Sequence, residues 1–242
     1  MKLVQKLQIG LAIACMMFAS CSKDDLQTPT PQTESVNTSS NLRVDVDAPP
    51  PFISSTKGFT GINILPANWV RNVVGGYSNN QQAYPAGVSD RFRLWGNPSI
   101  PFVQSLSVIP GATSIGSFVT VTTRGILDKS NKSSVKTKIY NLSVGKKYAL
   151  KVYVSSTLPK GDPAEYSPTF AKKALLTVSN QAVSQETVVD LTNYKFCWVE
   201  KIVTFTALSP QMDFAFSASP QYPGQYACAH LFVGYGAIEK LN

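Results

Sequence analysis

The sequence has little of the chemistry on which most metal sites and many enzymes depend. It contains one histidine and four cysteines among 242 residues, and no two cysteines have the close spacing of a structural zinc site. The single histidine, His230, lies in an apolar segment without the flanking pattern of a nucleophile elbow, which favours a role in the core. We therefore expect no metal, no cofactor and no catalytic residue.

Paired carboxylates of the kind that glycosidases use are also scarce. Asp162 and Glu165 stand close together, but they belong to a Gly-Asp-Pro segment that is typical of a solvated turn. Acids from distant strands could still converge in the folded chain. A hydrolase built from such acids is therefore kept as an alternative to the functions considered below.

A long hydrophobic run is missing as well. The stretch from Leu7 to Phe18 is apolar, but it is too short to span a bilayer. It follows Lys2 and Lys6 and ends at the small residues Ala19 and Ser20. A basic start, a short apolar stretch and a small-residue exit are the layout of a secretory signal, which we place at residues 1–20.

The end of this signal resembles the lipobox of bacterial lipoproteins. The matching residues are Phe18-Ala19-Ser20-Cys21, although the first lipobox position is usually a small aliphatic residue. The resemblance implies that Cys21 is acylated, with a palmitate-type lipid, and becomes the mature N-terminus. Cys15 is a rival site, but cleavage there would leave a signal of minimal length. Secretion without a lipid is the other alternative.

The residues after the cysteine indicate where the protein is carried. Ser22-Lys23-Asp24-Asp25 resembles the acidic sorting signal of Bacteroidetes lipoproteins, which implies exposure on the outer membrane; an ordinary hydrated linker is the alternative. Residues 21–51 are rich in Thr, Ser, Gln, Asn and Pro, so we expect a disordered tether about 30 Å long. Residues 52–242 then form one domain.

The net charge of the chain indicates which classes of partner it could bind. Removal of Lys2 and Lys6 with the signal lowers the formal net charge from +8 to +6. An exported basic protein does not meet nucleic acid in its own compartment, so its anionic partners would be acidic glycans, lipopolysaccharide or the membrane surface. Solubility alone also explains a modest positive excess.

Alternating apolar and polar residues dominate the rest of the sequence and predict an all-β domain. In 147–154, Tyr148, Leu150, Val152 and Val154 fall on one face, and Met212, Phe214 and Phe216 alternate in the same way. We expect antiparallel strands packed as a two-sheet sandwich. The expected strands are 100–109, 117–124, 135–142, 147–154, 174–179, 187–191, 196–207, 212–217 and 226–239.

Three further expectations concern local structure. The strand at 226–239 is apolar on both faces, so we expect it to be central in its sheet. Pro66 to Val74, followed by Gly75-Gly76, predicts one short helix. Cys197 and Cys228 both lie in predicted strands of an exported protein, which favours a disulfide over two buried thiols.

Two segments resemble galactose-binding-like β-sandwiches, the jelly rolls of many carbohydrate-binding modules. Leu142 to Leu150 is similar to their L-x-x-G-x-x-Y-x-L strand, and Trp198 to Ala207 to their W-x(5)-T-F-T-A strand. The resemblance implies a jelly-roll sandwich with Tyr148 and Phe205 in its core. The family often has an acidic pair near the start of the last strand, where this chain has Cys228-Ala229-His230, so no ligand residue is carried over.

The segment 75–97 has the composition of a sugar-binding loop, because aromatic rings stack on pyranoses while amides and guanidinium groups bind hydroxyls. An irregular loop whose aromatics cover the end of the sandwich is the alternative. The candidate ligand-binding residues are Tyr77, Asn79, Asn80, Arg91, Arg93 and Trp95.

These observations lead to one hypothesis and two alternatives. The hypothesis is a lipid-anchored, surface-exposed and non-catalytic protein that binds an extracellular glycan. The first alternative is a structural or adhesion lipoprotein that binds another surface protein. The second is the glycan-active hydrolase mentioned above.

Overall fold

The computed structural model describes residues 48–72, 84–110, 116–124, 133–160, 168–222 and 224–241. The candidate residues Cys21, Tyr77, Asn79 and Asn80 lie outside these ranges. All the described residues belong to one compact unit, Asp45–Asn242. Its elements are β1 (Phe52–Ile53), β2 (Gly61–Ile62), β3 (Val70–Arg71), β4 (Ala86–Ser89), the 3-10 turn η1 (Leu94–Gly96), β5 (Phe118–Thr123), β6 (Ser134–Tyr140), β7 (Lys147–Thr157), β8 (Pro168–Ser179), β9 (Ser184–Asp190), β10 (Val199–Thr206), β11 (Met212–Pro220), β12 (Tyr226–Phe232) and β13 (Ile238–Lys240).

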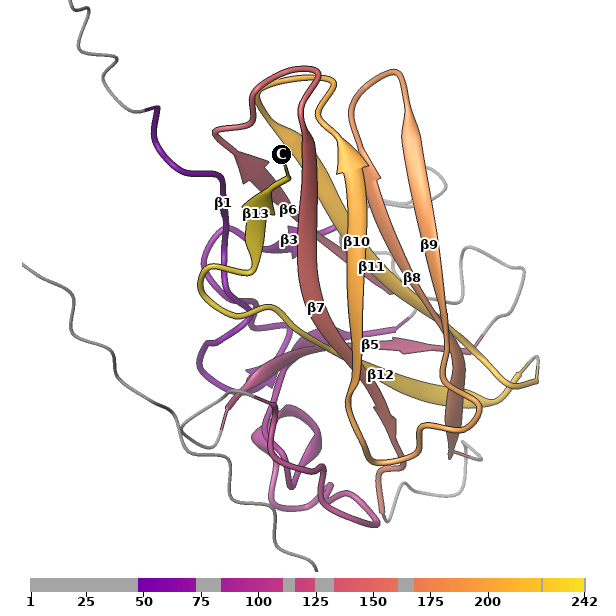
Figure 1. The fold of residues 1–242 in the computed structure, drawn as a ribbon. Coiled ribbons are helices and arrows are strands. Elements are labelled where there is room, and N and C mark those ends of the chain that lie inside the picture. The colour runs from indigo at the N-terminus through magenta and orange to yellow at the C-terminus, as the bar shows by residue number, and fades with distance from the viewer. Residues whose placement is uncertain are drawn as a thin grey trace, which may run out of the picture. The chain divides into compact units, whose positions relative to one another are not determined.

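The strands form a continuous sheet that curls over on itself (Figure 1). One layer runs β9-β8-β11-β6, and β1 and β3 pair with the free edge of β6. In the other layer β10 pairs with β7, and β7 is followed by β12, β5, β4 and β2. Strand β8 joins the layers, because its first residues pair with β12 and the remainder with β11 and β9. The arrangement is all-β and consistent with a sandwich.

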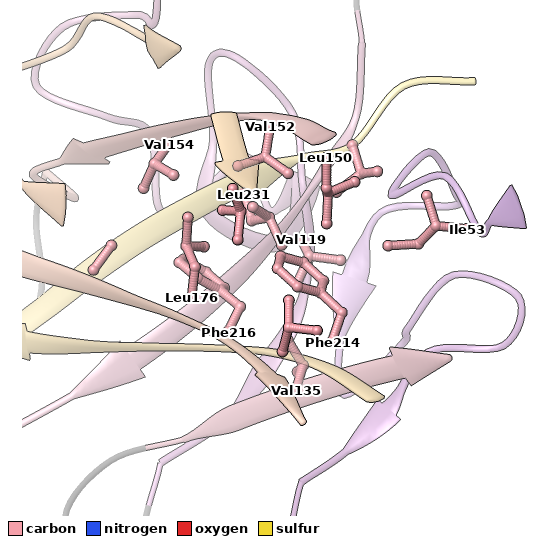
Figure 2. Close-up of a cluster of buried hydrophobic side chains, with 14 of the residues drawn as sticks. Ile53, Val119, Val135, Leu150, Val152, Val154, Leu176, Phe214, Phe216 and Leu231 are labelled. Atoms are coloured by element: carbon pink, nitrogen blue, oxygen red, sulfur yellow. The ribbon is translucent and has the colours of Figure 1, made fainter. Parts of the chain in front are cut away.

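The main core lies between the two layers (Figure 2). Phe214 and Phe216 from β11 and Leu176 from β8 meet Leu150 from β7 and Leu231 from β12, and all are buried. The alternating pattern in the sequence therefore predicted the buried faces of β6, β7 and β11 correctly. Each such side chain contributes about 1.5–3 kcal/mol when it leaves water, so these strands supply much of the stability.

The residues that resemble galactose-binding-like sandwiches have packing roles. Tyr148 and Phe205 are buried on neighbouring strands, and their rings stack with centroids 5.8 Å apart. Gly145 has a φ of +79° in the turn before β7, a conformation that side chains with a Cβ rarely adopt. The implied core positions are confirmed.

A second apolar cluster covers the outer face of β5 and β12. The segment 84–110 lies over these strands and contributes Leu94, Trp95, Phe102, Leu106 and Ile109. The strand predicted at 100–109 is wrong, since this stretch forms only isolated bridges at Pro101 and Phe102. Its buried residues follow a spacing of four and three, because the chain crosses the cluster irregularly rather than running within a sheet.

The helix predicted over Pro66–Val74 is also wrong for the residues that the structure describes. Asn68 has a φ of +65°, which ends any helix, and the next residues form β3 on the edge of β6. Trp69 is buried instead against Phe214, and its Nε1 donates a hydrogen bond to the Ser54 carbonyl at 3.1 Å. Within the described ranges, helical structure is limited to η1, and no helix is long enough to cross a membrane.

The last predicted strand is confirmed as central but is divided in two. Strand β12 has β5 on one side and both β7 and the start of β8 on the other. The chain then leaves the ladder at Val233, turns at Gly236 with a φ of +66°, and returns as β13 beside β7. The irregular stretch explains why one apolar run produces two strands.

Candidate functional site

An open groove of about 440 Å³ lies at one end of the layer β9-β8-β11-β6. Its size is within the range of about 300–1,000 Å³ that small-molecule sites occupy. Three strands, β6, β8 and β11, and two turns supply its walls. The lining residues are Lys138, Ser179, Asn180, Gln181, Ser209, Gln211 and Asp213.

The β8–β9 turn holds Asn180 at the edge of the groove. The side-chain Oδ1 of Asn180 accepts hydrogen bonds from the backbone N–H groups of Ala182, at 3.0 Å, and Val183, at 2.7 Å. The backbone N–H of Asn180 donates to the Val183 carbonyl at 2.9 Å. This Asx-type turn uses the oxygen of the side chain, so the amide NH₂ of Asn180 is left to donate to a ligand.

Another part of the lining comes from the segment before β11. The Leu142 backbone N–H donates to the Pro210 carbonyl at 3.0 Å, and the Ser209 hydroxyl donates to the Gln211 carbonyl. These bonds fix the backbone on both sides of Pro210. Gln211 is exposed, and its side-chain amide has no hydrogen bond to any described residue. It can therefore both donate to and accept from a ligand.

Two charged residues, Lys138 and Asp213, also line the groove. Asp213 on β11 accepts from two lysines of the neighbouring β6, Lys138 Nζ at 3.2 Å and Lys136 Nζ at 3.5 Å. The three side chains together carry one excess positive charge. All are 31–53% exposed, so the pairs add little to stability and their polar atoms remain open to a ligand.

The groove has the chemistry of polyol binding. Amides, hydroxyls, a carboxylate and an ammonium group in one concave site match the donors and acceptors of sugar hydroxyls. Asp213 is the one carboxylate among the lining residues, whereas glycoside hydrolysis commonly uses two. The described residues contain no cluster of His, Cys, Asp and Glu suited to hold a metal ion.

Trp95, the aromatic residue expected to stack on a sugar, has a different setting. Its side chain is 7% exposed, and it lies in the second apolar cluster. A Cβ built at Gly87 would come within 3.1 Å of the Trp95 ring, so the indole lies directly on the backbone of β4. Trp95 therefore packs in this structure in the way that the covering-loop alternative describes.

The two candidate arginines lie on the same covering segment and are half-buried. Arg91 donates from Nε to the Leu106 carbonyl at 2.9 Å, and its guanidinium lies 5.4 Å from the Phe92 ring. The backbone N–H of Arg93 donates to Asp90 Oδ1 at 2.9 Å. Arg91 thus holds the covering segment together, and neither arginine is among the residues that line the groove.

His230 is a core residue, as its apolar setting predicts. It is fully buried between the rings of Phe102 and Phe118, with Nδ1 2.9 Å from Thr120 Oγ1 and Nε2 2.7 Å from Thr157 Oγ1. Burial lowers the pKa of its imidazole from 6.5 to about 3, so the ring is neutral. It has no access to a substrate.

Cys197 and Cys228 are both thiols, and the expected disulfide between them is not formed. Cys228 lies on β12, whereas Cys197 lies just before β10, which begins at Val199 rather than at Phe196. Strands β10 and β12 pair with opposite edges of β7, which places them about 10 Å apart at the usual strand spacing. A disulfide needs Cα atoms about 5.5 Å apart.

None of the groove residues is among the ligand-binding residues predicted from the sequence. Ser179-Asn180-Gln181 and Ser209-Pro210-Gln211 both have the composition of turns, and each contains an amide. That signal marks two turns, but it does not show that they meet. Their convergence depends on the pairing of β8 with β11, which brings Ser179 opposite Asp213.

Comparison with known proteins gives distant structural similarities. No family model and no curated protein matches the sequence. The chain is similar to the TmCBM61 module in complex with beta-1,4-galactotriose, with 11% identity, a TM-score of 0.36, and coverage of 67% of this chain and 92% of that chain. It is also similar to a CBM4 module, with 16% identity, a TM-score of 0.34, and coverage of 58% and 91%.

A third similar structure is the enzymatically active domain of bacteriophage CBA120 tailspike protein 4. The identity is 9%, the TM-score is 0.41, and the match covers 72% of this chain and 20% of that one. The neighbours thus include carbohydrate-binding modules and a catalytic domain. All three TM-scores are below 0.5, so these similarities carry no argument about function.

Proposed function

We propose that this chain is a lipid-anchored, non-catalytic protein of the outer membrane surface that binds an extracellular glycan in the groove beside Asp213. The observation that carries the proposal is the groove itself, where amides, hydroxyls and a charged pair converge in about 440 Å³. The lipobox-like residues ending at Cys21 support the anchor, because an acylated N-terminus would hold the domain at the cell surface.

Binding would occur by hydrogen bonding to sugar hydroxyls. Gln211 and Asn180 both line the groove, and neither side-chain NH₂ group donates a hydrogen bond to a described residue. Asp213 accepts from a hydroxyl while Lys138 donates to one, in the paired manner that vicinal hydroxyls allow. The open groove suits one face of a chain rather than an enclosed monosaccharide.

The test is a glycan array with the purified Cys21→Ser chain, which cannot be acylated. Glycans that bind are then titrated against Gln211→Ala and against Gln221→Ala, a control just beyond the far end of β11. We expect about a tenfold loss of affinity for Gln211→Ala, the loss of roughly one good hydrogen bond, and none for the control. Binding to no glycan, or equal binding by both variants, would contradict the proposal.

The anchor and the lack of catalysis have separate tests. Radiolabelled palmitate should join the wild-type chain, and Cys21→Ser should release the processed protein from membranes. Incubation of each bound glycan with the purified protein should produce no new reducing ends. Release of such ends, abolished by Asp213→Asn, would instead support the hydrolase alternative.

A second candidate function is docking to another surface protein. Its support is an exposed apolar segment around β2, in which Phe59 is 91% exposed and Ile62 and Ile64 are about half exposed. An exposed patch at the edge of a sheet is a common protein contact. A membrane pull-down should then return one stoichiometric partner, which Phe59→Ser would lose.

A further inference from the structure

The rim of the polar groove is apolar at the tips of its turns. Val183 follows the lining residues of the β8–β9 turn and is 51% exposed, and Leu208 precedes Ser209 and is 45% exposed. Val144, at the tip of the β6–β7 turn, is 61% exposed. A single exposed aliphatic residue needs no explanation, but three turns with such tips beside one groove form an amphiphilic site.

Hydrogen bonds place these tips at one pole of the sandwich. The Gly145 backbone N–H donates to the Ala207 carbonyl at 2.8 Å, which joins the β6–β7 turn to the β10–β11 turn. The groove lining joins the β10–β11 turn to the β8–β9 turn through Ser209 and Asn180. In Figure 1 the three turns lie together at the top of the view.

This pole carries an excess of positive charge. Lys146 follows Val144 in the β6–β7 turn, Lys147 is the first residue of β7, and Lys240 lies beside them on β13, opposite Tyr148. Together with Lys138 they outnumber the acidic residues of the pole, Asp213 and Glu239, by two. Exposed lysines next to exposed aliphatic residues are the composition that binds an anionic membrane interface.

The N-terminal segment enters the domain at the same pole. The Asn141 side-chain Nδ2 donates to the Pro50 carbonyl at 3.0 Å, and Phe52 pairs with Tyr140 at the end of β6. The segment that would carry a lipid on Cys21 therefore joins the domain at this pole.

We propose that the groove binds the headgroup of an anionic glycolipid at a membrane surface, with Val144, Val183 and Leu208 contacting the boundary between headgroup and acyl chains. The amides and hydroxyls of the groove bind the sugar, and the lysines bind its phosphate or carboxylate groups. This inference rests on the proposed glycan binding and names its ligand class. We prefer a glycolipid to a soluble polysaccharide because a soluble polysaccharide has no acyl chains for the three apolar turn tips to contact.

The test measures cosedimentation of the Cys21→Ser chain with phosphatidylcholine vesicles that contain lipopolysaccharide. The combined variant Val144→Ser, Val183→Ser, Leu208→Ser should lose vesicle binding about tenfold, since each change removes apolar contact with the interface. It should still bind the delipidated saccharide of the same lipopolysaccharide. Val188→Ser, an exposed valine on β9 opposite Leu175, is the matched control and should bind vesicles normally.

The outcomes separate the two proposals. Unchanged vesicle binding by the combined variant overturns the glycolipid inference and leaves glycan binding intact. A second result also overturns the inference: vesicles of phosphatidylcholine and phosphatidylglycerol, without lipopolysaccharide, bind the chain as well as vesicles with lipopolysaccharide do. Negative charge alone would then explain the binding. If the delipidated saccharide does not bind, or Gln211→Ala binds it as the parent does, the proposed function itself fails.

Discussion

The outer faces of the two layers differ, because one is covered by another segment of the chain and the other is exposed. The face of β5 and β12 is covered by the segment 84–110, which buries Trp95, Phe102 and Leu106. The face of β6 and β11 instead presents Lys138, Asp213 and the polar groove. The difference shows that aromatic residues in a loop next to a sheet do not by themselves mark a binding site, since they can complete a second core.

The largest expected effect is a loss of stability when the covered face is altered. Trp95→Ala should lower the free energy of unfolding by about 3–5 kcal/mol, the usual cost of removing a buried tryptophan. Glycan affinity of the remaining folded protein should not change. Denaturant unfolding measures the first quantity. An unchanged midpoint with lost glycan binding would mean that Trp95 is a ligand platform.

The covered face should also show a specific pH dependence. The pKa of His230 is lowered to about 3, so as the pH falls below about 6.5 the unfolded chain takes up a proton that the folded chain does not. The stabilising effect of a neutral His230 is complete above pH 6.5 and is lost between 6.5 and 3, at about 1.4 kcal/mol per pH unit.

The measurement is urea unfolding between pH 6.5 and 5, in which the parent is compared with His230→Gln. The variant is less stable overall, but its stability should be nearly flat over this range. A slope equal to that of the parent would show that His230 does not contribute to the acid sensitivity.

The sequence predicts a region of these two faces only where apolar and polar residues alternate along a strand. Strands β6, β7 and β11 each carry large apolar residues on the face toward the main core and smaller or polar residues on the other, so their alternation can be recognised in the sequence. The covering segment has no such period. Its course is set by Asp90, whose Oδ1 accepts from the N–H groups of Phe92 and Arg93, and by the unusual positive φ of Trp95.

The candidate site was beyond sequence reasoning for a related reason. Asn180, Gln211 and Lys138 lie on separate segments and meet only through strand pairing. The disulfide prediction failed in the same way, because the sequence does not show that β7 separates the strand of Cys228 from the segment of Cys197.

The smallest expected effect concerns the open face. Asp213→Asn removes the partner of Lys136 and Lys138, whose side chains are 37% and 53% exposed. Pairs at such exposure contribute about 0–1 kcal/mol, so thermal unfolding should shift only slightly. A large loss of stability would show that the groove is a structural element rather than a binding surface.

The most direct test of the account compares the two faces with one ligand. A glycan found on the array is titrated by calorimetry against Gln211→Ala from the groove and Arg93→Ala from the covering segment. The account predicts about tenfold weaker binding for Gln211→Ala and unchanged binding for Arg93→Ala. The reverse result would place the site on the covering segment and contradict the assignment to the groove.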